Sequence, residues 1–398
     1  MSQPIKIKEP RGASLVIPGF ALWQLGFRPF YLLASTFAAL SIALWALQFA
    51  GWLSTPYLSG PMWHAHEMLF GFTLVVVVGF LFTAGRNWSN RPTPTGASLA
   101  ALAALWVVAR VLVLTPFGWA AAVANVAFPL ASAIALGIPF IASGNRRNYF
   151  FIGLLLLMAV AVGMVHLAQL GVVQMPAWVG IQMALDVILF IMAVVAGRVV
   201  PMFTNNGVPG ANATRQPVIE KLALGSVLSL LLADGLQWHG PALIALVGLG
   251  ALAHLARWVL WQPAKTRHTP IVWVLHIAYL WIPVHLVLRG MAELGWVLPS
   301  AATHALTVGA IGGLIIGMMT RTARGHTGRP LKADRAEVLC YVLVLLAALV
   351  RVFVPLVAPA QLVHAVLWSA ALWSGAFGLY AVRYWPVLTR PRLDGKPG

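Results

Sequence analysis

Long apolar stretches separated by short polar connections run along the whole chain. Each stretch is about twenty residues long, which is the length that an α-helix needs to cross a bilayer core of ~30 Å. The short alternating segments typical of a transmembrane barrel do not occur. The pattern predicts an all-α, polytopic membrane protein with about twelve transmembrane helices, at roughly 29–50, 67–85, 97–115, 119–141, 149–171, 177–200, 218–237, 241–261, 271–294, 300–319, 336–357 and 360–383.

Positive charge alternates between successive connections. Basic connections follow the even-numbered helices, and the densest of them runs from Arg321 to Arg335. The opposite connections carry no Lys or Arg, at 51–62, 171–177, 238–240 and 295–300. The positive-inside rule places the basic connections and both termini in the cytoplasm. We therefore expect a multi-pass protein of a bacterial-type inner (cytoplasmic) membrane, with cytoplasmic N- and C-termini and no cleaved signal peptide.

Composition narrows the class of protein further. Of the 398 residues 60% are hydrophobic and only 9% charged, against roughly 25% charged in a soluble domain. The net charge of +17 lies in the loops, so the expected partner is the lipid bilayer and not nucleic acid. Cys340 is the only cysteine, which excludes an intrachain disulfide, an iron–sulfur cage and covalently attached haem. We expect one membrane domain over 1–398, with a cytoplasmic segment 1–28, a twelve-helix bundle 29–383 and a tail 384–398.

Two histidines begin segments that match each other. When His66 is aligned with His304, glycines coincide five and thirteen residues later and arginines coincide twenty and twenty-five residues later. His166 and His285 match in the same way, 285 − 166 = 119 residues apart. The spacing predicts three four-helix units in the same orientation, because an even number of helices preserves direction. Chance matching among apolar, glycine-rich helices is the alternative.

The ionisable residues within the predicted spans gather towards the outer membrane face. Such residues at membrane depth line a bundle interior or a cavity and mark functional sites. Imidazoles from different helices are common ligands of haem iron and of copper. The topology brings eight of these residues to the outer half: His64, His66, Glu67, Arg110, His166, His285, His304 and Arg351.

The matched pair His66 and His304 is the first choice for the two ligands of a non-covalent, b-type haem. Arg110 and Arg351 are candidates to bind the haem propionates, with snorkelling towards the interface as the alternative. Small residues on one face of the tenth helix admit either a flat macrocycle or a close neighbouring helix, namely Gly309, Gly313 and Gly317.

His64 and His66 are two residues apart and would diverge by roughly 200° around a regular helix. They cannot then hold one metal ion together. Glu67 would orient an imidazole, or would simply favour the positive end of the helix dipole. The sequence does not divide haem ligands from copper ligands, and the metal-binding candidates are His64, His66, His166, His276, His285 and His304.

Two further pairs of ionisable residues have a structural explanation as well as a functional one. Arg289 and Glu293 are one helical turn apart, which favours a neutralised structural pair. His254 and His276 would form a second metal site on adjacent helices, or would each make a single bond to the backbone.

Several segments, in order along nearly the whole chain, form a recognisable set: Gly26–Phe30 (GFRPF), Trp63–Phe72 (WHAHEMLFGF), Gly79–Thr83 (GFLFT), Gly197–Thr204 (GRVVPMFT), Leu275–Trp281 (LHIAYLW), His304–Gly312 (HALTVGAIG) and Gly325–Arg329 (GHTGR). Together they resemble the NnrS family. One departure is Gly85-Arg86, where the family pattern would have Val-Pro.

The resemblance implies a membrane protein that contains haem and copper, engages nitric oxide or a derived species and relieves nitrosative stress. It leaves open whether the protein is an enzyme, a haem/copper redox protein acting on nitric oxide, or binds or senses the molecule. Three four-helix units with haem between the second and tenth helices would also be similar to the catalytic subunit of haem–copper oxidases, although their adjacent His-His copper pair is lacking. The alternative function is a transporter or permease with a His- and Arg-lined cavity near the outer face.

Overall fold

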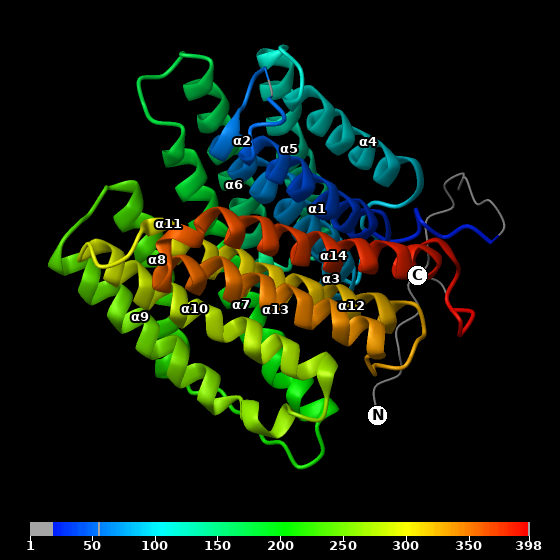
Figure 1. Ribbon diagram of the computed structural model, residues 1–398. Helices are drawn as coiled ribbons and strands as arrows, with labels where there is room; N and C mark the ends of the chain where they lie inside the picture. Colours follow the sequence, from blue (N-terminus) through cyan, green and yellow to red (C-terminus); the bar gives the residue numbers. More distant parts are fainter. Residues whose placement is uncertain (1–18, 55, 397–398) are drawn as a thin grey trace.

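The structure is a computed structural model that describes residues 19–54 and 56–396, and within these residues it contains helices and no strand. Twelve helical passes run back and forth through a bundle (Figure 1). Ten passes are single α-helices: α1 Phe27–Phe49, α4 Gly96–Val113, α5 Gly118–Ala142, α6 Phe150–Gln169, α7 Trp178–Gly207, α8 Pro217–Gly235, α9 Pro241–Leu260, α10 Pro270–Glu293, α13 Arg335–Val357 and α14 Leu362–Thr389. Short 3-10 helices occupy Arg146–Asn148, Pro263–Thr266 and Pro359–Gln361.

The second and tenth passes each contain a π-helical segment between two α-helices. The second consists of α2 Gly60–His66, η1 Glu67–Thr73 and α3 Leu74–Ser89. The tenth consists of α11 Pro299–His304, η4 Ala305–Gly312 and α12 Gly313–His326. In both passes the π-helix begins at the residue after the histidine of the matched pair, and π-helical turns occur frequently at functional sites.

The passes correspond one to one to the predicted spans, which confirms an all-α, multi-pass membrane fold. Eleven are long and apolar enough to cross a membrane, and the twelfth, α8, is more polar because it carries Glu220, Lys221 and Asp234. The second pass begins earlier than predicted, at Gly60, since Pro61 suits a first helical turn. The three-unit repeat and the likeness to haem–copper oxidases stay predictions.

The predicted terminal segments fit the structure only in part. The segment 1–28, which was predicted to be cytoplasmic, lies mostly outside the described residues, and α1 already begins at Phe27. The tail predicted from residue 384 begins later, because α14 continues to Thr389. Ala21 donates its backbone N–H to the carbonyl of Thr389 at 2.7 Å. Both described ends of the chain therefore lie at the same end of the bundle, as an even number of passes requires.

The second, sixth, ninth and tenth passes form the interior of the bundle, and the other passes surround them. α7 contacts α2, η1 and η4. The two π-helical segments therefore share α7 as a neighbour. Large apolar side chains on the outer passes point away from the protein, among them Ile134, Leu252 and Val382. In a bilayer these side chains contact lipid.

The glycines of the tenth pass face a neighbouring helix. A Cβ atom at Gly309 would collide with the ring of Trp281 on α10, and Gly313 and Gly317 meet α10 in the same way through Ala278 and Leu275. Of the two alternatives left open by the sequence, these small residues serve the close helix contact. They position η4 and α12 against α10.

Candidate functional site

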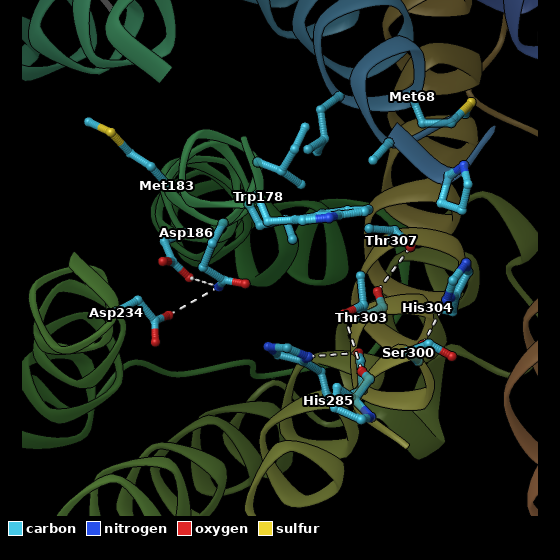
Figure 2. A pocket seen from close by; sticks show the side chains of 18 of the residues that line it. Met68, Trp178, Met183, Asp186, Asp234, His285, Ser300, Thr303, His304 and Thr307 are labelled. Carbon is cyan, nitrogen blue, oxygen red and sulfur yellow. Dashed lines mark hydrogen bonds between the residues drawn. The ribbon is translucent and has the colours of Figure 1, made fainter. Parts of the chain in front are cut away.

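A cavity of about 1260 Å³ lies at the end of the bundle whose connections carry no Lys or Arg. This exceeds the ~300–1,000 Å³ usual for small-molecule sites. Residues of α1, α2, η1, α6, α7, α8, α9, α10, α11, η4, α13 and α14 line it. Figure 2 shows Trp178 extending from α7 across the cavity towards Thr307 of η4, with His285 and His304 on the wall beside them.

His64 and His304 line this cavity together. Their ring centroids are 6.2 Å apart and their planes differ by only 9°. The ring of His64 also stacks on Trp45 of α1, with centroids 4.8 Å apart. Nδ1 of His304 donates to the carbonyl of Ser300 at 2.7 Å, which leaves Nε2 as a lone-pair donor. Nδ1 of His64 is buried and has no hydrogen-bond partner.

The structure thus brings His64, and not His66, to the same cavity as His304. The sequence alignment matched His66 with His304, and these two differ in environment. His285 also lines the cavity and donates Nδ1–H to the carbonyl of Ala302 at 2.8 Å. Arg351 lines it as well, and no hydrogen bond or ion pair to its guanidinium is found among the described residues.

A cluster of two carboxylates, one amide and one guanidinium forms another part of the cavity wall. Gln182 donates to Asp186 at 3.1 Å and to Asp234 at 3.0 Å (Figure 2). Arg289 pairs with Asp234, and its other terminal nitrogen lies 4.0 Å from Asp186. The predicted pair of Arg289 with Glu293 is therefore wrong. Glu293 instead accepts the backbone N–H of Gly240 at 2.6 Å, because the start of α9 presents a free donor there.

His66 belongs to a separate, buried chain of polar groups. Its Nδ1 donates to Glu67 at 2.7 Å, and its Nε2 lies 3.1 Å from Nε2 of His166 on α6. Arg110 of α4 donates to the same carboxylate oxygen of Glu67 at 2.5 Å and also bonds to Asn125 of α5. The carboxylate thus orients His66 and is neutralised by Arg110, which faces this chain and not the cavity.

Tyr57, which lies in the connection before α2, completes this chain. Its hydroxyl is 2.9 Å from Nδ1 of His166. Burial raises the pKa of Tyr57 to about 12, so the phenol is neutral at physiological pH. If Tyr57 donates to His166, then His166 donates to His66 and the chain is a continuous relay of hydrogen bonds. If Tyr57 accepts, the two Nε2 lone pairs face each other and are available to a metal ion.

Sequence reasoning missed Tyr57 because no motif marks it, and 109 residues separate it from His166. Asp186 and Asp234 lie inside predicted helices, and no motif marks them as part of a site. Both residues interact with side chains of other helices. The partners are too far apart along the sequence for helical spacing to predict the contacts.

His276, a predicted metal ligand, is separated from the cavity. Its Nε2 lies 2.8 Å from the hydroxyl of Thr204 on α7. His254 bonds to the hydroxyl of Tyr279 at 2.6 Å and to the carbonyl of Ala223 at 3.1 Å. The two histidines have separate partners, so the structure does not join them in one site.

Within the described residues, no group of three or more His, Cys, Asp or Glu side chains is arranged to hold a metal ion. The histidines pair instead, as His64 with His304 and as His66 with His166. Two imidazoles suffice for haem, because the porphyrin supplies the other four nitrogens. A bare ion would need further ligands from water or from a small molecule.

A protein-family model described as NnrS protein matches residues 21–392, which is nearly the whole chain. A search of curated proteins finds no match.

Proposed function

The chain belongs to the NnrS family, and we propose that it is a haem-binding membrane protein that engages nitric oxide or a related species in the large cavity. Membership of this family suggests a membrane protein of the nitric oxide response. The observation that carries the proposal is the pair of nearly parallel imidazoles of His64 and His304 in one cavity.

The proximity of the two imidazoles supports the proposal that both would hold the haem. Imidazole nitrogen is a common ligand of haem iron. The observed separation between His64 and His304 is 6.2 Å. Arg351 supplies an unpaired guanidinium in the same cavity, suited to a propionate carboxylate. When bound, haem would supply an iron centre that nitric oxide ligates.

The two histidines differ in how firmly the protein holds them. The bond from Nδ1 to the Ser300 carbonyl orients His304 and raises its basicity as a ligand. Among the described residues no hydrogen bond to Nδ1 orients His64, whose ring contacts those of Trp45 and His304. When haem is bound, His304 would therefore hold it more firmly than His64, and His64 would be the side chain that yields its place more readily to a small molecule.

The second pair, His66 and His166, suits copper better than haem. Both rings are buried, and Nε2 atoms 3.1 Å apart leave no room for a macrocycle between them. The two nitrogen atoms are close enough that both would bind one copper ion if their lone pairs face each other. Imidazole nitrogen is a preferred ligand of copper. Copper at this pair would lie close to the proposed haem, because His64 and His66 are two residues apart.

Purification of the whole chain, after expression with ample haem and copper, tests the proposal. We expect a Soret band typical of two axial histidines, about one haem per chain, and a shift of that band on anaerobic addition of nitric oxide. His64→Ala should weaken haem binding, whereas His239→Ala, at the exposed rim of the same cavity, should not. A wild-type protein that carries no haem under these conditions would overturn the proposal and favour a transporter or permease.

A further inference from the structure

A second, smaller cavity lies at the basic end of the bundle, opposite the large cavity. At this end α12 ends, α13 begins and α14 ends (Figure 1). It has a volume of about 220 Å³. Six polar side chains line it, which are Arg324, Arg329, Glu337, Arg383, Tyr384 and Arg390. We call this cavity the arginine pocket.

The carboxylates near the arginine pocket are already bound by other groups. Glu337 accepts from Arg324 at 2.7 Å and from the hydroxyl of Tyr384 at 2.5 Å. Asp334 accepts from Arg383 at 2.7 Å and caps the start of α13. These bonds offset the charges of Arg324 and Arg383, and hydrogen bonding to Arg383 holds the pKa of Asp334 below its usual value despite partial burial.

Arg329 and Arg390 have no such partner. Among the described residues no carboxylate lies within ion-pair distance of either guanidinium. Nη1 of Arg329 is buried and makes no hydrogen bond. Burial and the nearby charges of Arg324, Arg390 and Arg383 lower the pKa of Arg329. A buried charged donor without a partner is costly, so the pocket holds an excess of positive charge that an anion would neutralise.

The chain fixes Arg329 in this unfavourable place by tying down the loop that carries it. Leu393 donates its N–H to the carbonyl of Thr327 at 3.1 Å, and Arg392 donates to the carbonyl of His326 at 3.0 Å. Gly328, just before Arg329, has a φ of +73° that a side chain would disfavour. These bonds hold the backbone just before Arg329 against the segment that follows α14.

We propose that the arginine pocket binds a phosphate group, carried by a phospholipid headgroup or present as a free phosphate. Planar guanidiniums bind phosphate oxygens in pairs of parallel hydrogen bonds. Basic pockets between transmembrane helices on the positively charged side of the membrane are suited to anionic headgroups. Pro386 and Val387 form an apolar wall beside the arginines, where the non-polar part of a lipid would lie.

The test compares the unfolding temperature of the purified whole protein in two settings. In detergent, inorganic phosphate is added against chloride of equal ionic strength. In nanodiscs, phosphatidylcholine alone is compared with phosphatidylcholine plus phosphatidylglycerol. We expect a rise in unfolding temperature with phosphate, with phosphatidylglycerol, or with both. A rise in nanodiscs alone identifies a lipid headgroup, and a rise in detergent alone identifies free phosphate.

Arg329→Gln should remove most of this stabilisation, whereas Arg335→Gln removes the same charge from an exposed position outside the pocket and should keep it. Arg329→Lys keeps the positive charge but lacks the planar guanidinium that binds two phosphate oxygens at once. This variant should retain part of the stabilisation. If neither phosphate source stabilises the wild-type protein, or if Arg335→Gln abolishes the effect as fully as Arg329→Gln, the proposal is wrong.

Discussion

The second and tenth passes have similar backbones around one histidine each, His66 and His304. The two histidines differ in the groups that they contact. Each pass begins with a proline in its first turn, reaches the histidine at the end of a short α-helix and continues as a π-helix. His304 lines the large cavity. His66 is fully buried and bonds to Glu67 and His166. In the second pass the position facing the cavity belongs to His64 instead.

The residue that follows each histidine accounts for this difference. Glu67 follows His66, and its carboxylate, neutralised by Arg110, binds the imidazole through Nδ1. Ala305 follows His304 and offers no side-chain acceptor, so that imidazole bonds to a carbonyl of its own helix. Equivalent positions in the two passes thus have a similar backbone, while an adjacent buried charge decides the chemistry of the side chain.

The largest effect that we expect from the difference between His304 and His66 is on haem binding. His304→Ala should lower the haem affinity on the order of tenfold or more, while His66→Ala should leave the haem content unchanged. The reason is that His304 lines the proposed haem cavity and His66 does not. Haem per chain, measured from the Soret absorbance of purified variants, checks this. An equal loss of haem in both variants would contradict this prediction and would favour His66 as a haem ligand.

The next effect concerns the charge that sets His66 apart. Arg110→Ala leaves the carboxylate of Glu67 buried without its cation, which should lower the free energy of unfolding by ~3–5 kcal/mol. The double variant Glu67→Gln, Arg110→Met removes both charges and should be less unstable than Arg110→Ala alone. Unfolding temperatures in detergent distinguish the two, and a double variant as unstable as the single one contradicts the pairing.

A smaller effect tests the close contact of the tenth pass with α10. Gly309→Ala places a Cβ atom against the ring of Trp281, and overpacking of this kind costs ~1–3 kcal/mol. Gly153→Ala in α6 is the control, because no atom lies within 4 Å of the added Cβ. The control should be neutral or slightly stabilising in the same thermal unfolding experiment. Equal destabilisation by both substitutions would show that the contact is not the cause.

The smallest expected effect concerns Tyr57. Tyr57→Phe removes one hydrogen bond to His166, worth ~0.5–1.5 kcal/mol. Burial raises the pKa of Tyr57 to about 12 in the folded protein, against ~10 in an unfolded chain. Its stabilising contribution is therefore complete below pH ~10 and is lost as the pH rises towards the folded pKa. The difference in unfolding temperature between wild type and Tyr57→Phe should shrink above pH ~10, and a constant difference contradicts this.

The backbone was predictable because a bilayer leaves the chain few options. Every backbone polar group must be bonded within its own segment, so apolar stretches of sufficient length become helices. Helical geometry also predicted that His64 and His66 point in different directions, and the structure places one in the cavity and the other in the buried chain. The start of α2 was misplaced because the connection before it contains apolar and polar residues in similar numbers.

The site was less predictable because its contacts join distant parts of the chain. The pair of Glu67 with Arg110 spans 43 residues, and that of Arg289 with Asp234 spans 55. Sequence spacing favoured Glu293 for Arg289, since it lies one turn away, but α9 offers Glu293 a backbone donor. Nothing in the sequence marks which face of a pass turns inwards, because the rotation of a helix depends on its neighbours.

The contact between the first and last helices has a consequence for biosynthesis. α1 packs against α14, and Ser374 of α14 donates to the carbonyl of Ala39 in α1 at 2.9 Å. Helices enter the membrane in the order in which the ribosome makes them, so α1 must keep one face against lipid until the last 28-residue helix arrives. Arg28 then binds the carbonyls of Leu388 and Arg390. A nascent chain released before residue 390 would leave α1 without these partners. We expect a membrane protease that degrades loosely packed helices to attack α1 of such a chain first.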